Sequence, residues 1–81
     1  MKRKSEVEIG KRAHKTMLAL FPDKSNVFIA KVIGTNTTTL WEWGQGKTPS
    51  GIFLARMLEL GIDVEWILTG RSNGNENYFR P

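Results

Sequence analysis

The side chains that could do chemistry gather in residues 26–45, and their types suit hydrogen bonding to a partner better than catalysis. This stretch is rich in amide and hydroxyl groups. The chain has no cysteine, which excludes a Cys/His set, and its single histidine, His14, belongs to no recognisable Ser/His/Asp set. We expect His14 to be a solvated residue on a helix surface. The sequence therefore predicts no enzyme activity, no metal site and no cofactor.

Four positions in this stretch have the residue types and spacing of a helix-turn-helix. Ala30 is small, which lets a second helix pack closely, and Gly34 follows where a tight turn needs conformational freedom. Leu40 and Trp43 come six and nine residues after the glycine and would anchor the second helix to the core. In this motif the second helix enters the major groove of DNA. The pattern predicts a reading helix over about 36–45.

With Leu40 and Trp43 pointing inward, the other side chains of this helix would face outward. The predicted contacts to base edges are Asn36, Thr37, Thr38, Trp41, Glu42 and Gln45. Gln45 can pair bidentately with adenine, Glu42 can accept from a cytosine amino group, and threonine methyl groups can meet a thymine methyl group. Trp41 and Trp43 cannot both point inward. Trp41 therefore either packs over a neighbouring helix, which we favour, or is exposed and contacts sugars or thymine methyl groups.

Contacts to phosphate groups are expected around this face. The predicted phosphate contacts are Ser25, Asn26, Lys31, Thr39 and Lys47. Ser25 and Asn26 open the preceding helix, whose first amide groups can face a phosphate.

The basic residues are concentrated in the first half of the chain. Residues 1–40 hold eight Lys/Arg and three Asp/Glu, whereas residues 41–81 hold four and five, within a net charge of +4. This distribution favours a polyanionic partner near the N-terminal half. The basic arm is formed by Lys2, Arg3 and Lys4. This arm either enters a groove, follows the DNA backbone or only keeps the terminus soluble.

Local start and stop signals predict five helices, and no stretch alternates like a β-strand. The helices are expected at about 6–20, 26–33, 37–45, from Thr48-Pro49 to near Gly61, and 64–69. The expected N-caps are Ser5 with Glu8 as a capping box, Ser25 or Asp23, Asn36, Thr48, and Asp63. The helices are expected to end before Pro22 and at Gly34, Gly61 and Gly70. We expect Arg56, on the fourth helix, to be a surface or interface residue.

Five helices in so short a chain predict a compact all-α domain whose helices cross at steep angles. The expected organisation is a basic N-terminal arm over 1–5, a helix-turn-helix domain over 6–70, and a polar C-terminal tail or linker over 71–81.

Two segments carry a resemblance to a known family. Residues 34–46, GTNTTTLWEWGQG, resemble the reading-helix segment of lambda-repressor-like domains, in which a glycine turn, a small polar cap and a helix ending near W-x-x-G recur. Residues 61–70, GIDVEWILTG, are similar to the G-x-x-x-x-W-L-L-x-G ending of phage CI-type repressors. The resemblance covers about residues 8–70 and implies a five-helix repressor domain. In this chain the reading helix carries no Lys or Arg, and Thr35 stands at a turn position that is usually apolar.

The resulting expectation is a transcriptional regulator, of phage or prophage type, that binds a palindromic double-stranded DNA operator as a homodimer. The alternative is a protein-interaction module that binds RNA polymerase or another regulator. The candidate dimer surface is the fourth and fifth helices with the tail, where Tyr78 and Phe79 could dock. Its apolar residues are Ile52, Leu60, Ile62 and Val64. Either these exceed what one small core consumes, or the core absorbs them all.

The chain has no apolar run near the roughly 20 residues that span a bilayer. Its basic start is followed by the polar residues 5–8 rather than by the apolar region of a signal peptide. We therefore expect a cytoplasmic protein with no membrane partner.

Overall fold

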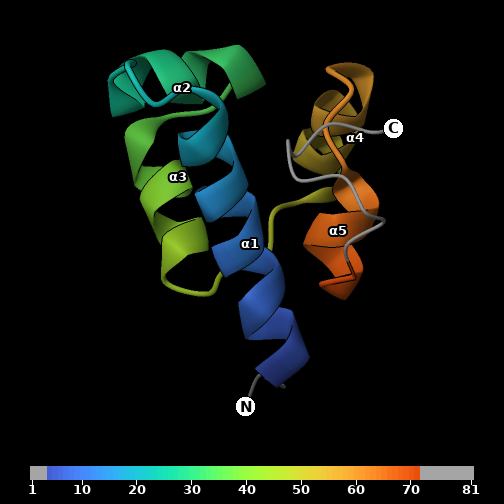
Figure 1. The fold of residues 1–81 in the computed structure, drawn as a ribbon. Coiled ribbons are helices and arrows are strands. Elements are labelled where there is room, and N and C mark those ends of the chain that lie inside the picture. Colours follow the sequence, from blue (N-terminus) through green and yellow to red (C-terminus); the bar gives the residue numbers. More distant parts are fainter. Residues whose placement is uncertain (1–3, 72–81) are drawn as a thin grey trace.

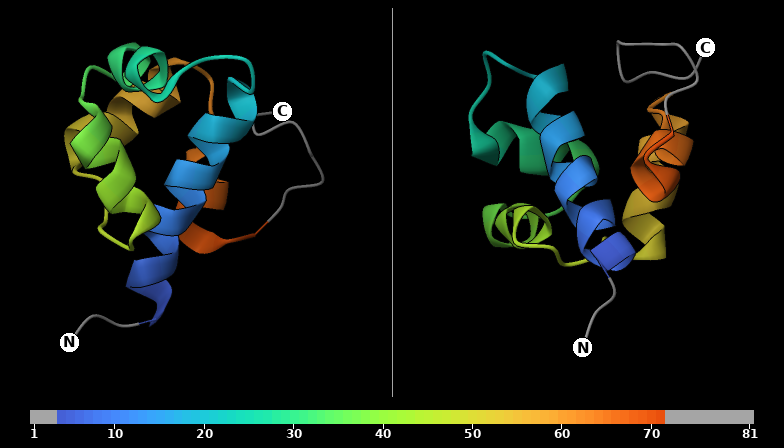
Figure 2. Two further views of the ribbon diagram at one scale, coloured as in Figure 1. Left: turned by 90° about the vertical axis from the view of Figure 1, so that its left-hand side faces the viewer. Right: turned by 60° about the horizontal axis from the view of Figure 1, so that its bottom comes forward.

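The computed structural model describes residues 4–71, and within that range the chain forms five α-helices and no β-strand (Figure 1). Their bounds are α1 Lys4–Leu20, α2 Asn26–Ile33, α3 Thr37–Gly44, α4 Gly51–Glu59 and α5 Val64–Thr69. The predicted compact, all-α fold of five helices is confirmed. Helix α1 runs through the middle, with α2 and α3 on one side and α4 and α5 on the other, as the right-hand view of Figure 2 also shows.

Helix α1 begins two residues earlier than predicted. Lys4 and Ser5 lie inside it, so the predicted capping box with Ser5 as N-cap is wrong, and the helix takes up the last two residues of the predicted arm. No proline or glycine stands at 4–9 to stop a helix, which allows it to extend. The other end is as predicted, because α1 stops at Leu20, shortly before Pro22.

A short connection joins α2 to α3. Ser25 is the N-cap of α2, and its side chain accepts a hydrogen bond from the amide of Phe28 at 3.2 Å. Gly34 ends α2 with φ 80°, the left-handed conformation that glycine adopts without strain. Asn36 then caps α3, with its Oδ1 accepting from the Thr39 amide at 2.8 Å. The chain therefore breaks its helix at Gly34 and starts a new one at Thr37.

The start of α4 differs from the prediction. We expected Thr48 as N-cap and Pro49 as the first helical residue, but the helix begins at Gly51 with Ser50 as N-cap, and Ser50 makes no side-chain capping bond. Pro49 is buried, so tertiary packing holds it in the connection before the helix. Helix α5 agrees with the prediction: Asp63 caps it through the Trp66 amide at 3.0 Å, and Gly70 closes it with φ 73°.

All five helices contribute to one hydrophobic core. The buried core residues are Ala13, Met17, Ile29, Ile33, Leu40, Trp43, Met57, Ile62 and Ile67. Trp43 is the largest of them, and its ring lies 5.8 Å from that of Phe53 on α4, at a tilted angle. Burying Trp43 ties α3 to the rest of the domain and fixes which of its faces points outward.

Helix α1 approaches the end of α3 very closely. Gly10 is buried, and a Cβ atom there would collide with the carbonyl oxygen of Lys47 and lie 2.8 Å from that of Trp43. One turn further along α1, His14 lies against α3: a Cβ atom on Gly44 would be 2.9 Å from His14 Nδ1. Two glycines therefore permit this close packing. His14 is half-buried against α3, so the prediction of a solvated surface residue is wrong.

Candidate nucleic-acid interface

The four predicted motif positions have the burial and backbone geometry that the motif requires. Ala30, Leu40 and Trp43 are buried, and Gly34 has a positive φ in the turn. The turn is closed by hydrogen bonds from the Gly34 amide to the Lys31 carbonyl at 3.0 Å and from the Thr35 amide to the Ala30 carbonyl at 2.9 Å. The backbone between α2 and α3 is therefore held in one conformation.

The face of α3 opposite the core is open to solvent. The exposed predicted base contacts are Asn36, Thr37, Thr38, Trp41 and Gln45, whereas Glu42 is half-buried. Trp41 is 60% exposed and Trp43 only 1% exposed. The favoured interpretation, in which Trp41 packs over a neighbouring helix, is therefore wrong. Residues two apart on a helix lie on nearly opposite sides, so burying Trp43 turns Trp41 outward.

Asn36 has less hydrogen-bonding capacity for a partner than its exposure suggests. Its side-chain oxygen is the acceptor that caps α3, which leaves the side-chain amide N–H groups as donors. Gln45 is the C-cap residue of α3, where its backbone amide bonds to the carbonyls of Trp41 and Glu42. Its side chain is exposed, on the same outward face as Trp41 and Thr38 by helical spacing.

Glu42 and Lys47 form an ion pair. Lys47 Nζ lies 3.4 Å from Glu42 Oε2, and both side chains retain solvent access. From the sequence we expected Glu42 to contact bases and Lys47 to contact phosphate, and did not foresee that the two side chains meet. The pairing reduces the repulsion that the Glu42 carboxylate would exert on a polyanion.

The predicted phosphate contacts differ in their exposure to solvent. Ser25, Asn26 and Lys31 are exposed, and Thr39 is half-buried. The first amide groups of a helix have no acceptor within it, and Ser25 satisfies only that of Phe28. The start of α2 therefore presents amide donors beside exposed polar side chains.

Several predicted contacts lie outside the described residues. Lys2 and Arg3 precede the described range, and Lys4 is described only as part of the α1 backbone. The tail from residue 72 onward, with Tyr78 and Phe79, also lies outside it.

Arg56 supports the turn from the neighbouring helix α4, a role that was not predicted from the sequence. Its Nη1 donates to the Ile33 carbonyl at 2.9 Å and to the Gly34 carbonyl at 3.3 Å, and its guanidinium lies over the Phe53 ring. These bonds satisfy carbonyls at the end of α2, where a positive charge is favourable. The local sequence does not predict this role, because Arg56 is more than twenty residues from the two carbonyl groups that it binds.

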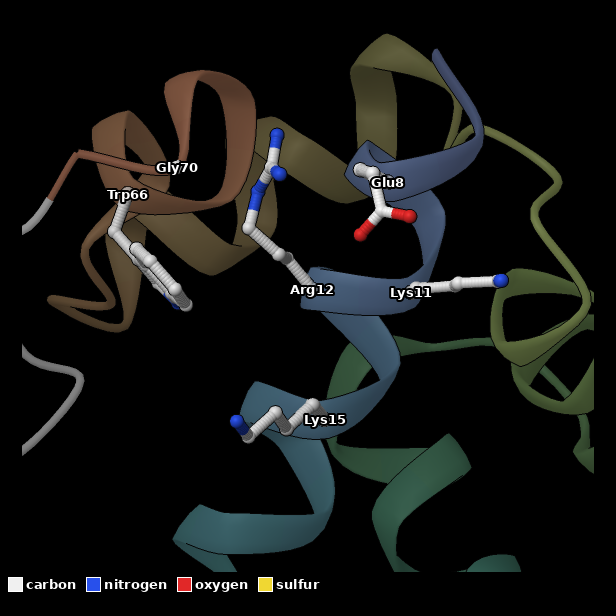
Figure 3. Close-up of a pocket in the computed structure, with 6 residues that line it drawn as sticks. All are labelled: Glu8, Lys11, Arg12, Lys15, Trp66 and Gly70. Atoms are coloured by element: carbon white, nitrogen blue, oxygen red, sulfur yellow. The ribbon is translucent and has the colours of Figure 1, made fainter. Parts of the chain in front are cut away.

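Three cationic residues of α1 border a hollow between α1 and α5, which Figure 3 shows. The hollow is lined by Glu8, Lys11, Arg12, Lys15, Trp66 and Gly70. Arg12 reaches across it and donates to the carbonyls of Ile67 at 2.8 Å and Leu68 at 3.2 Å, at the end of α5. Lys11 points away from Trp66 (Figure 3). The bonds of Arg12 dock α5 on α1, on the side of α1 away from α3 (Figure 1).

The candidate dimer surface is only partly consumed by the core. Ile62 is buried and Val64 half-buried, so the core takes these two. Ile52 and Leu60 are exposed, as are Leu58 and Leu68. The alternative in which the core absorbs all four residues is therefore wrong, and Ile52 and Leu60 are in excess of what the core buries.

Searches for related proteins found no matching protein family, curated protein or solved structure. None of the helices in residues 4–71 has the length and apolar character needed to cross a membrane.

Proposed function

We propose that this domain is a sequence-specific, double-stranded DNA-binding transcriptional regulator of the phage or prophage repressor type. The observation that carries the proposal is the outward face of α3. It follows a tight turn at Gly34, it is anchored by the buried Leu40 and Trp43, and its hydroxyl, amide and indole groups are exposed. A helix presented in this way fits the major groove, which accepts one α-helix.

The neighbouring groups suit the DNA backbone. The start of α2 offers amide donors and the exposed Ser25 and Asn26, and Lys31 lies at the other end of the same helix. Lys47 lies three residues after the end of α3. In the proposed complex these groups set the position of the domain, and the face of α3 distinguishes the bases.

The proposal includes a homodimer on DNA, with one copy of α3 in each half of a palindromic operator. Two-fold symmetry would place the half-sites about one helical turn apart, roughly 34–36 Å, or a multiple of it. A dimer bound over a promoter would block the start of transcription or redirect it. Contact with RNA polymerase would belong to the same mechanism.

Salt dependence tests the proposal. We expect binding to a duplex selected from random DNA to weaken steeply as salt rises. The double variant Lys31→Ala/Lys47→Ala should bind both selected and unrelated DNA more weakly, and its log–log salt slope should fall by about one unit for each phosphate that is no longer neutralised. Fluorescence anisotropy over a salt series measures both quantities.

The double variant Lys11→Ala/Lys15→Ala is the matched control. It removes the same charge from two positions on α1 that are not among the predicted DNA contacts. If it lowered the salt slope as much as the first pair, net charge alone would explain binding. The proposed role of Lys31 and Lys47 would then be wrong.

The second candidate is a protein-interaction module that binds RNA polymerase or another regulator. The large exposed area of Trp41, on a helix without Lys or Arg, favours it, because aromatic residues dominate protein interfaces. A partner held mainly through Trp41 would bind with little dependence on salt, and no DNA sequence would be enriched in selection.

A further inference from the structure

We infer that the operator half-site consists mainly of A·T base pairs and that Trp41 recognises it through the 5-methyl groups of thymine. The inference rests on the proposed DNA-binding function and specifies its ligand. It starts from one observation: the most exposed large apolar side chain in the described part of the chain, Trp41 at 60%, lies on the face proposed to meet the bases.

The composition of that face argues against a half-site that is recognised mainly through guanine bases. Guanine presents two acceptors in the major groove, N7 and O6, which Arg or Lys usually reads. Helix α3 carries neither residue. The nearest following cation, Lys47, is paired with Glu42 at 3.4 Å. The face therefore lacks the groups that most often recognise G·C pairs.

The arrangement of the remaining groups favours A·T pairs. Thr37, Trp41 and Gln45 follow one another at intervals of four residues, so they form a single strip along α3. Thr38 adjoins Trp41 three residues before it. A threonine methyl group beside an indole ring makes an apolar surface, and thymine is the one unmodified base that offers a methyl group in the major groove. Gln45, at the end of the strip, can pair with the adenine of an adjacent A·T pair.

The test removes the methyl groups and changes nothing else in the base pairs. A duplex selected from random DNA by the full chain is resynthesised with deoxyuridine in place of thymidine in each half-site, one position at a time. Dissociation constants for the thymine duplex and for each uracil duplex are measured for the wild type, for Trp41→Ala, and for Ile52→Ala as the control. Ile52 has nearly the same exposure, 58%, but lies on α4. Any effect of Ile52→Ala on dimerisation would change binding to the thymine and uracil duplexes equally, so it would cancel in their ratio.

The expected selected half-site is dominated by A·T pairs. Uracil should weaken wild-type binding about fourfold for each methyl group that Trp41 covers, the factor that corresponds to burying one methyl-sized group. In Trp41→Ala the ratio of the two dissociation constants should fall towards one, whereas Ile52→Ala should keep the wild-type ratio. Because Trp41 lies outside the core, Trp41→Ala should unfold at the wild-type temperature, which circular dichroism verifies.

Four results would overturn the inference. A guanine-led half-site, or equal binding to thymine and uracil duplexes by the wild type, would leave DNA binding intact and refute methyl recognition. An unchanged thymine-to-uracil ratio in Trp41→Ala would refute the assignment to Trp41. Selection that enriches no duplex would overturn the proposed function itself, and the inference with it.

Discussion

Gln45 combines a fixed backbone with a free side chain. Its amide closes α3 through the carbonyls of Trp41 and Glu42, while its side-chain amide is exposed. Gln45→Ala should weaken binding to the selected operator by about 1–3 kcal/mol, the value of one bidentate base contact. Binding to unrelated DNA should stay nearly unchanged, because the variant retains every group proposed to bind phosphate. Titrations against the two duplexes measure the difference, and an equal loss on both would remove Gln45 from base recognition.

His14 makes the stability of the domain depend on pH. Burial against α3 lowers the pKa of His14 from its ordinary value of 6.5, because the charged imidazolium loses hydration. The unfolded chain therefore binds a proton more readily than the folded chain. The contribution of neutral His14 to stability is full above pH 6.5 and is lost as the pH falls from 6.5 through the lowered folded-state pKa.

We expect His14→Gln to remove this part of the pH dependence. Urea unfolding of the wild type and the variant between about pH 7.5 and pH 5 gives the free energy of unfolding at each pH. The difference between the two proteins should change across this interval, because the carboxylates contribute equally to both. Parallel curves would contradict the role of His14.

Single residues also show which features the sequence could predict and which it could not. The burial of Ala30, Leu40 and Trp43 and the turn at Gly34 could be predicted, because these residues follow a fixed local spacing. The packing of His14 and the bonds of Arg56 could not, because both depend on groups far away in the chain. Trp41 was misjudged because the spacing shows that its side chain faces away from Trp43 but not whether a neighbouring helix covers it.

At the scale of helices, local signals predicted the ends well wherever a cap made its own hydrogen bonds. Helix α2 lies between Ser25 and Gly34, and α5 between Asp63 and Gly70, and both have the predicted bounds. The predicted start of α4 was wrong because burial of Pro49, a tertiary effect, outweighed the preference of proline for the first helical turn.

The close approach of α1 to α3 gives a prediction for Gly10. Alanine normally favours a helix over glycine by about 0.5–1 kcal/mol. At Gly10, however, the added methyl group meets backbone carbonyls of Lys47 and Trp43, which cannot rotate away. We expect Gly10→Ala to lower the free energy of unfolding by about 1–3 kcal/mol net, the usual cost of overpacking. Urea unfolding followed by circular dichroism measures it.

Gly51→Ala is the matched control. Gly51 is also helical and exposed, and a Cβ atom there meets nothing within 4 Å. This variant should be neutral or slightly more stable than the wild type. If Gly10→Ala were equally harmless, the packing of α1 against α3 would be looser than described.

At the scale of the whole domain, not all apolar side chains are buried in the core. The core takes one or more residues from every helix, yet Ile52, Leu58, Leu60 and Leu68 remain exposed on α4, α5 and the connection between them. This side lies across α1 from α3 (Figure 1). Dimer contacts there would leave the outward face of α3 free for DNA, as the proposed mechanism requires.

The separation of the two faces of α3 has a practical consequence. Leu40 and Trp43 hold the helix in place, whereas Thr37, Thr38, Trp41 and Gln45 are exposed. Under the proposed function, specificity and folding thus depend on different residues of one short helix. The exposed four can be randomised in a library with little loss of folded protein, which makes the domain a scaffold for engineering new target preferences.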